Sequence, residues 1–169
     1  MSENYAKEFD GMVEKAKAAK KPMRVALAGA DVENMLVGIF DAAAAGFVEP
    51  ILIGDEKKIL ALLDKLGLRD RSYELQPIDA DANAVQYAIE MINAGKADCL
   101  MRGNTQTRDF LMPVLNKANH LIKPDALVTH VVFLKVPDYD RLLAISDVTL
   151  LINPSADGAG KSPSTWSRR

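Results

Sequence analysis

Residues 97–111, ADCLMRGNTQTRDFL, decide how the fold of this 169-residue chain is interpreted. The stretch begins with a short apolar segment, passes through Gly103, and continues into amide and hydroxyl side chains before a segment with a helical pattern. An apolar run that ends in glycine and leads into a helix is typical of a buried strand in a parallel α/β sheet. We therefore predict a strand over 97–103 and a helix over 107–119.

The same alternation of strand and helix runs through the preceding part of the chain. Short apolar runs predict strands, and apolar positions at helical spacing predict amphipathic helices between them. Four strand-to-helix passes with short connections predict a three-layer α/β/α fold, with a mostly parallel sheet between helices. The further predicted strands are 23–29, 49–54 and 73–79, and the further predicted helices are 3–21, 32–46, 56–67 and 82–96.

Single residues mark where several of these helices begin and end. Asp31 precedes a helical segment and is predicted to cap it through a side-chain oxygen, and Asp55 precedes the next one. Gly46, Gly67 and Gly95 follow helical segments and are predicted to stop them.

After Lys123 the helical period is lost. Residues 126–136 and 141–153 are apolar and are separated by the turn sequence Pro-Asp-Tyr-Asp at 137–140. This pattern predicts two antiparallel strands joined by a tight turn. We expect the pair to be attached to the mostly parallel sheet.

Composition sets limits on the class of protein. The chain is 49 % hydrophobic and 26 % charged, with a net charge of −2, which favours no nucleic acid or anionic membrane as partner. No apolar stretch reaches the roughly 18 residues of a spanning helix, and the polar N-terminus does not resemble a signal peptide. Cys99 lies in an apolar run and is expected to be a buried thiol. We expect a soluble cytoplasmic protein.

The polar residues that follow the 97–103 strand are candidates for an anion site. Ligands of parallel α/β sheets lie beyond the carboxyl ends of the strands, where helix N-termini offer free N–H groups and a positive dipole end. The alternative is an ordinary helix start, with Asn104 or Thr105 as the cap and no ligand. Neither a Walker A loop nor a G-x-G-x-x-G fingerprint is present. The candidate phosphate-binding residues are Arg102, Gly103, Asn104, Thr105 and Thr107.

Residues elsewhere carry weaker signals. His130 is either a general acid or phosphate ligand, or a packed core residue, and with His120 as the only other histidine no zinc site is predicted. Asp147 is a carboxylate in an apolar strand and should have a partner. Four cations are either phosphate ligands or ordinary surface residues: Arg24, Lys117, Lys123 and Arg141.

The sequence resembles the N-terminal half of the phosphate acetyl/butyryltransferases over residues 5–155, most closely the phosphate butyryltransferase branch. Each short motif is weak alone, but their order and spacing together are specific. The motifs that carry the resemblance are VALAGADVENML, EPILIGDEKKI, AGKADCLMRGNTQTRDFLMPVLNK, THVVFLKVPDYDRLLAISDV and INPS.

The resemblance implies a reaction in which acyl-CoA and inorganic phosphate give acyl phosphate and free coenzyme A. It implies the fold of the first domain of an isocitrate or isopropylmalate dehydrogenase, and no metal or resident cofactor. Coenzyme A and phosphate would be substrates, and a homo-oligomer is one open alternative for assembly. Phosphate would contact the candidates at 102–107 and Lys123, with Thr129, His130 and Asp147 as catalytic candidates.

The resemblance also implies a domain organisation. Residues 1–155 would form the N-terminal α/β domain, and 156–169 an irregular tail that is either a disordered end or the product of an early end of the coding frame. Relatives continue into a second domain that supplies the base and several coenzyme A contacts. The two function hypotheses are a truncated acyltransferase and a non-catalytic module that binds a phosphorylated small molecule or a partner chain.

Overall fold

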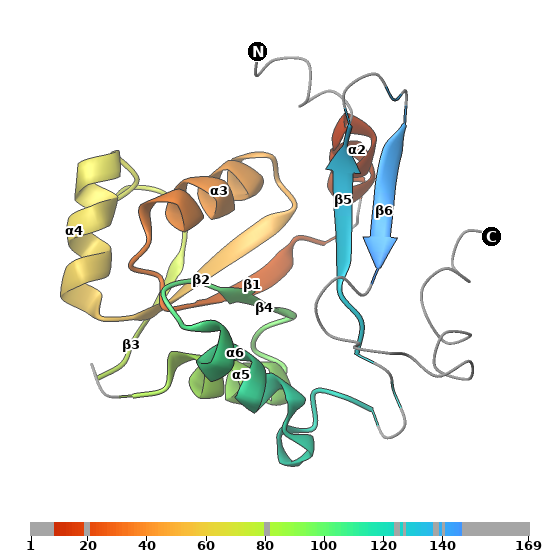
Figure 1. The fold of residues 1–169 in the computed structure, drawn as a ribbon. Helices are drawn as coiled ribbons and strands as arrows, with labels where there is room; N and C mark the ends of the chain where they lie inside the picture. The colour runs from red at the N-terminus through yellow and green to blue at the C-terminus, as the bar shows by residue number, and fades with distance from the viewer. Residues whose placement is uncertain are drawn as a thin grey trace. The chain divides into compact units, whose positions relative to one another are not determined.

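The structure, a computed structural model, describes residues 9–18, 21–79, 82–123, 126, 128–136, 139 and 141–146. The chain divides into two compact units (Figure 1). One unit comprises Lys15–Ile122, and the other comprises Met1–Glu14 with Lys123–Arg169. None of the helices in the described ranges is both long and apolar enough to span a lipid bilayer.

The larger unit, Lys15–Ile122, is built on a four-stranded sheet in the order β3-β2-β1-β4. All three strand pairings are parallel, which confirms the predicted parallel sheet. In register, Leu27 of β1 lies between Leu52 of β2 and Met101 of β4. The strands are β1 Met23–Ala28, β2 Val48–Gly54, β3 Glu74–Pro77 and β4 Cys99–Arg102.

Helices cover both faces of this sheet, so the unit has the predicted three layers (Figure 1). Alternate residues of β1 face opposite ways: Leu27 packs with α3 and α4, whereas Ala26 and Ala28 pack with α5. Residues of α6 pack on the α5 side. The helices of the described residues are α2 Asp10–Lys17, α3 Glu33–Ala44, α4 Glu56–Leu66, α5 Ala84–Asn93, α6 Thr107–Leu115 and the short 3₁₀ helix η2 Lys117–Asn119.

Local signals placed the ends of α4 correctly. The Asp55 carboxylate accepts a hydrogen bond from the backbone N–H of Lys58 at 3.2 Å, as an N-cap should. Gly67 ends the helix with a positive φ of 66°, a conformation that glycine adopts without steric cost. Asp31 was predicted to cap α3, and this prediction is wrong, because Val32 holds the N-cap position without a side-chain hydrogen bond.

The two predicted C-terminal strands are present as β5 Val131–Lys135 and β6 Leu142–Ser146, and they pair antiparallel. Within the described residues they form a two-stranded sheet of their own, so they do not extend the parallel sheet as expected. The two strands are close in sequence, so the loop between them costs little entropy to close, which accounts for their pairing with each other. The predicted strand over 141–153 is described only as far as Ser146, and the tail from residue 147 lies outside the described residues. The predicted domain boundary at residue 155 stays a prediction.

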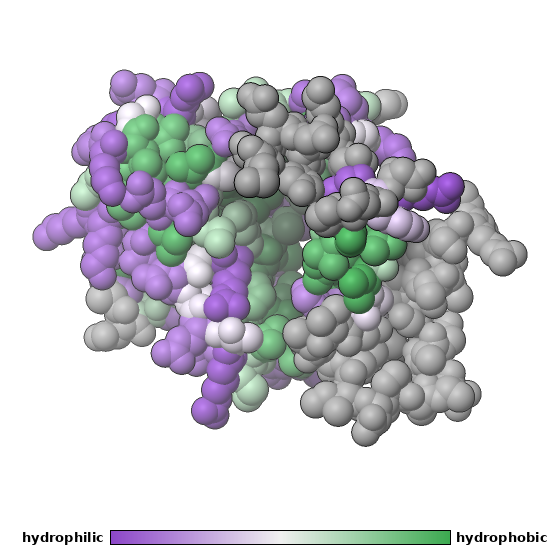
Figure 2. Space-filling model, turned by 45° about the horizontal axis from the view of Figure 1, so that its top comes forward, coloured by the Kyte–Doolittle hydropathy of each residue, from purple (hydrophilic) through white to green (hydrophobic). Residues whose placement is uncertain are grey.

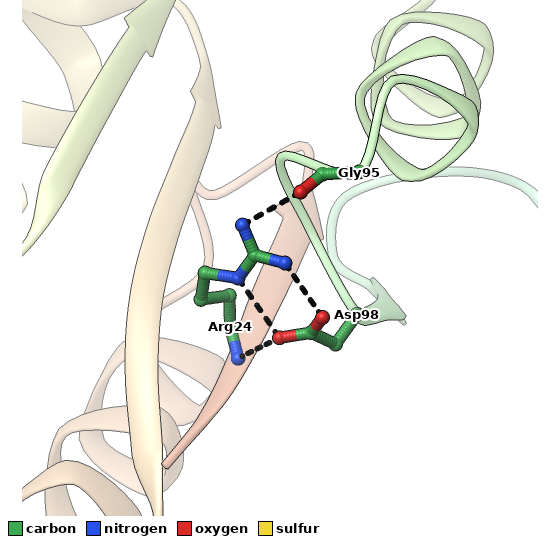
Figure 3. A network of polar contacts seen from close by, with 3 residues as sticks. All are labelled: Arg24, Gly95 and Asp98. Carbon is green, nitrogen blue, oxygen red and sulfur yellow. Dashed lines mark hydrogen bonds and ion pairs between the residues drawn. The ribbon is translucent and has the colours of Figure 1, made fainter. Parts of the chain in front are cut away.

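An ion pair joins the beginning of β1 to the loop before β4 (Figure 3). Arg24 donates through Nε and Nη2 to the Asp98 carboxylate at 2.9 and 2.7 Å, and its backbone N–H donates to the same carboxylate at 3.0 Å. Its Nη1 donates to the backbone oxygen of Gly95 at 2.8 Å. One side chain thus binds both the exit of α5 and the entry of β4.

The contribution of the Arg24–Asp98 ion pair to the stability of the fold should depend on pH, and replacing Asp98 with alanine tests this. Hydrogen bonds from the Arg24 side chain and backbone hold the pKa of the Asp98 carboxyl well below its usual value of about 4. A carboxyl with a lower pKa in the folded state stabilises the fold above about pH 4 and loses that effect as the pH falls further. We expect Asp98→Ala to lower the urea midpoint near neutral pH. The difference in urea midpoint between the variant and the wild type should become smaller below about pH 4.

Asp70 offers the matched control, because it is an exposed carboxylate with no ion pair among the described residues. Asp70→Ala should change the urea midpoint near neutral pH much less than Asp98→Ala does, because it breaks no ion pair of the described residues. If the difference in urea midpoint between Asp98→Ala and the wild type is the same at every pH, the ionised Asp98 carboxylate does not stabilise the fold through Arg24.

Candidate active site

The predicted anion site lies at the carboxyl ends of β1 and β4. The chain passes from β1 to β2 and β3 on one side, then returns to place β4 on the other side of β1. The strand order therefore reverses between β1 and β4. Ligands of open α/β sheets bind in the crevice outside the carboxyl ends of the strands at such a switch point. Arg102 is the last residue of β4, and residues 103–106 lead from it into α6 at this location.

Two glycines allow the strand ends to meet there. The N–H of Gly103 donates to the backbone oxygen of Ala28 at 2.9 Å, and the N–H of Asn104 donates to that of Gly29 at 2.7 Å. A Cβ atom on Gly103 would lie 2.0 Å from the Gly29 oxygen. Gly103 is not among the glycines with positive φ, so contact alone requires it. The packing of two strand ends therefore explains this glycine without a ligand.

Helix α6 begins at Thr107, as the sequence predicts, and the N–H groups of the corner that have no acceptor among the described residues belong to its start. The amides of Gly103 and Asn104 are paired with β1, and the N–H of Thr105 donates to the Gly103 oxygen at 2.9 Å. Helix α6 then begins with Gln106 as N-cap and without a side-chain cap, so neither Asn104 nor Thr105 caps it. Within the described residues, no acceptor pairs with the backbone N–H groups of residues 106–109. An uncapped helix start presents these donors and its positive dipole end to an anion.

Arg102 folds back over this helix start. Its Nε donates to the backbone oxygen of Thr105 at 3.0 Å, and its Nη1 donates to the Thr107 hydroxyl oxygen at 3.1 Å. Because that oxygen accepts from Arg102, the hydroxyl proton of Thr107 is available to another acceptor. The Thr105 hydroxyl oxygen is buried and has no partner among the described residues. The corner thus holds a cation, free amides and a hydroxyl that lacks a partner.

A carboxylate borders the same corner. Asn104 Nδ2 donates to Asp31 Oδ2 at 3.0 Å, which links the segment after β4 to the segment after β1. The negative charge of Asp31 opposes an anion nearby, whereas Arg102 and the helix dipole favour it. This contact joins residues far apart in the sequence, and no local signal predicts it.

The remaining predicted site residues belong to other segments of the chain. Lys123, Thr129 and His130 are in the smaller unit, where Lys123 is exposed and the other two are half-buried. Asp147 lies outside the described residues. Arg24 lies at the amino end of β1, on the opposite edge of the sheet, and is bound by Asp98. In the described part of the chain, no group of three or more metal-ligating side chains is found.

Two pockets of the larger unit lie away from the corner. One, of about 570 Å³, lies beyond the carboxyl ends of β2 and β3, and its charged residues are Asp55, Glu56, Asp79 and Lys57. The other, of about 470 Å³, lies near the amino ends of the strands between Glu49 and Glu74. The excess of acidic residues makes the first pocket a poor site for a phosphate group.

Cys99 was expected to be a buried thiol, and the structure makes it a poor candidate for a nucleophile. The thiol is half-buried at the start of β4, and its sulfur donates to the Leu100 backbone oxygen at 3.7 Å. Burial, with a smaller effect of the Asp98 charge, raises the pKa of the Cys99 thiol. Little of it is therefore the reactive thiolate near neutral pH.

Comparison with known proteins relates this chain to one class of enzyme. No protein-family model matches the chain. It is 32 % identical to the phosphate butyryltransferase of Clostridium acetobutylicum over 148 residues, which is 88 % of this chain and 48 % of that protein. It is 27 % identical to the phosphate acetyltransferase of Thermotoga maritima over 150 residues, 88 % of this chain and 49 % of that protein.

The fold is similar to that of a solved phosphotransacetylase. The EutD phosphotransacetylase of Staphylococcus aureus superimposes with a TM-score of 0.72 at 22 % identity, covering 92 % of this chain and 54 % of the other. The protein is thus an α/β protein whose fold matches about half of a phosphotransacetylase chain.

The resemblance drawn from the sequence is confirmed, and the chain is a relative of the phosphate butyryltransferases and phosphate acetyltransferases. It spans about half the length of these relatives.

The contact at Gly103 can be tested with an alanine substitution. Gly103→Ala places a methyl group against the Gly29 backbone oxygen, and rigid backbone cannot yield as a flexible side chain would. We expect a loss of at least about 3 kcal/mol in the free energy of unfolding, measured by urea denaturation.

Gly38 provides the matched control, because nothing lies within 4 Å of its Cβ position in the middle of α3. Gly38→Ala should stabilise the protein by about 0.5–1 kcal/mol through helix propensity. Equal effects of the two substitutions would contradict the close approach of β1 and β4.

Proposed function

We propose that this chain is the phosphate-binding half of an acyltransferase that moves an acetyl or butyryl group between coenzyme A and inorganic phosphate. The observation that carries the proposal is the uncapped start of α6 beside Arg102 at the β1/β4 switch point. It occurs in a chain that is 32 % identical to a phosphate butyryltransferase.

In this proposal the corner holds the phosphate that reacts. The N–H groups of residues 106–109, the Thr107 hydroxyl and the guanidinium of Arg102 would donate to its oxygens. The unpartnered hydroxyl of Thr105 would gain an acceptor. Holding the anion beside the thioester converts a reaction of two solutes into one between bound groups.

The proposed chemistry follows from the two substrates. A phosphate oxygen attacks the carbonyl carbon of the thioester, a C–O bond forms, and the C–S bond breaks. Coenzyme A leaves as a thiolate and takes up a proton, and the reverse reaction needs a base to remove that proton. We propose no metal and no resident cofactor. Lys123, Thr129, His130 and Asp147 are proposed to line the same cleft, and the base is proposed to come from the half that this chain does not span.

Finer features are part of the same proposal. The fold would be that of the first domain of an isocitrate or isopropylmalate dehydrogenase. The enzyme would be cytoplasmic, with a homo-oligomer as one alternative for its assembly. The net charge of −2 gives no reason to expect a nucleic acid partner. The acyl group is not assigned, since two methylenes change binding by only about 1–3 kcal/mol each.

One observation favours a second candidate. Because the chain spans about half of its relatives, it has the anion corner without a described base beside it. The alternative function is a non-catalytic module that binds a phosphorylated small molecule or a partner chain.

Phosphate binding can be measured on the chain alone. Titration with inorganic phosphate should shift the NMR signals of the amides of residues 106–109 in a saturable manner, because these N–H groups have no acceptor among the described residues. Arg102→Ala should weaken binding by about tenfold or more, as expected when a charge-assisted contact is removed. Shifts confined to other parts of the chain would contradict the proposed site.

Turnover distinguishes the two candidate functions. The chain should be joined to the remaining half of the Clostridium acetobutylicum phosphate butyryltransferase and assayed for phosphate-dependent release of coenzyme A from acetyl- and butyryl-CoA. Arg102→Ala should lower kcat/KM by about 10²-fold, the effect of removing a donor that stabilises developing charge. Arg71, an exposed arginine on the loop before β3, is the control and should change kcat/KM little. Phosphate binding without turnover in any form would favour the non-catalytic module.

A further inference from the structure

Asp31 brings a carboxylate to the proposed phosphate site. It comes two residues after Gly29, beyond the carboxyl end of β1, and is half-buried. Its Oδ2 accepts a hydrogen bond from Asn104 Nδ2 at 3.0 Å, whereas no donor to its Oδ1 is found among the described residues. In that part of the chain Asp31 also forms no ion pair with a lysine or arginine. A carboxylate without a cation repels an anion, so its presence at this corner needs an explanation.

Backbone hydrogen bonds hold Asp31 at this position. The N–H groups of Gly29 and Ala30 both donate to the Ile53 oxygen at 3.0 Å, and Ala30 is fully buried. The Gly29 oxygen accepts from the N–H of Asn104 at 2.7 Å. The segment before Asp31 is therefore bound to β2 on one side and to the loop after β4 on the other. The carboxylate is kept beside that loop.

The loop that contacts Asp31 also leads to the donors of the corner. Arg102 precedes it and donates to the Thr105 backbone oxygen at 3.0 Å and to the Thr107 hydroxyl oxygen at 3.1 Å. The N–H groups at the start of α6 come next. An anion bound here meets donors from the segment after β4 and one carboxylate from the segment after β1. Donors alone accept any tetrahedral oxyanion, whereas an acceptor among them requires the ligand to carry a hydrogen.

We propose that Asp31 makes the corner selective for oxyanions that carry a proton, so that it binds inorganic phosphate in preference to sulfate. The inference rests on the proposed function, because it takes the corner to be the phosphate site. Near neutral pH an inorganic phosphate ion retains at least one hydroxyl group, and this hydroxyl donates to Asp31 Oδ1. Sulfate has the same tetrahedral shape but no proton, so one of its oxygens would face the carboxylate without a hydrogen between them.

The same hydrogen bond orients the bound ion. A hydroxyl that donates to a carboxylate forms a charge-assisted bond, which is stronger than a bond between neutral groups. The protonated oxygen of phosphate is then turned toward Asp31. Its unprotonated oxygens are left for the guanidinium of Arg102 and the N–H groups of α6. No proton has to move for this selection.

A purely structural role for Asp31 is the alternative. In that case the carboxylate would only hold Asn104, and the choice between phosphate and sulfate would not depend on it. A neutral carboxamide oxygen accepts the same hydrogen bond without repelling an anion. The negative charge is therefore unnecessary for holding Asn104, which favours the selective role.

The wild-type chain tests the selectivity directly. Inorganic phosphate and sulfate should be titrated separately at constant ionic strength and about pH 8, where both ions carry about two negative charges. Binding is followed through the NMR signals of the amides of residues 106–109. We expect phosphate to bind at least about tenfold more tightly than sulfate, because only phosphate can donate to the carboxylate. Equal affinities would overturn the proposal.

Substitution of Asp31 assigns the selectivity to one side chain. Asp31→Asn keeps an oxygen that can accept from Asn104 and removes the negative charge. Sulfate should bind to this variant about tenfold or more tightly than to the wild type, and the preference for phosphate should be largely lost. Asp31→Ala should lose the preference too, and it serves as the second variant if Asp31→Asn does not fold. An unchanged preference in a folded variant would overturn the proposal.

Glu33 provides the matched control for the loss of a negative charge near this end of β1. It is exposed in the first turn of α3, and its carboxylate pairs with Lys65 at 2.6 Å. Glu33→Gln should change the affinities for both ions by the same factor, because a charge that touches neither ion acts on both alike. An equal loss of preference in Glu33→Gln and Asp31→Asn would contradict the specific role of Asp31.

The titrations separate this inference from the proposed function. Saturable phosphate binding at residues 106–109 together with equally tight sulfate binding would keep the phosphate site and reject the role of Asp31. The absence of a saturable shift of these signals with either ion would reject the site, and the selectivity with it.

Discussion

The close approach of Gly29 and Gly103 is the contact on which the candidate site depends. Strand β4 has only four residues, and its carboxyl end is joined to β1 by hydrogen bonds from Gly103 and Asn104. No side chain fits at Gly103, since its Cβ would lie 2.0 Å from a backbone oxygen. At the other end of β4, Arg24 binds Asp98 through three hydrogen bonds. A short strand is thus held at both ends, and the start of α6 is set by where β4 stops.

This arrangement explains why the anion donors appear where they do. The amides of residues 103–105 are paired within the protein, so these residues position the helix start and offer no backbone donor to an anion. The helix start that follows has no side-chain cap. The Arg102 side chain donates a hydrogen bond to the backbone oxygen of Thr105 in the loop before it. The usual role of a cap is to satisfy such N–H groups, so its absence leaves them to an external acceptor. The carboxylate of Asp31, which accepts a hydrogen bond from Asn104, repels an anion at this corner. The proposed binding of phosphate therefore depends on well-placed N–H donors as well as on positive charge.

Much of the fold could be predicted because its signals are local. The apolar runs, the Asp55 cap and the Gly67 stop each depend on residues within one turn of the position concerned. The pairing of β1 with β4 and the Arg24–Asp98 ion pair could not be predicted. Each joins residues 74 positions apart in the sequence. Gly103 shows at a single position what the sequence alone does not predict. A glycine can serve a turn, a ligand or the packing of two strands, and only the position of Gly29 decides between them.

The described residues of the two units differ in how completely their apolar side chains are buried. Every fully buried hydrophobic residue of the described chain lies between Val25 and Ala97, in two clusters on opposite faces of the parallel sheet. The anion corner is attached to that closed core and needs no further element to keep its shape. Among the described residues of the β5–β6 pair, Val131–Lys135 with Leu142–Ser146, none is in the buried class. Figure 2 shows a hydrophobic patch, in green, over this pair. In the proposed function, the contacts of phosphate with Arg102 and the α6 amides therefore come from the unit that has a closed core.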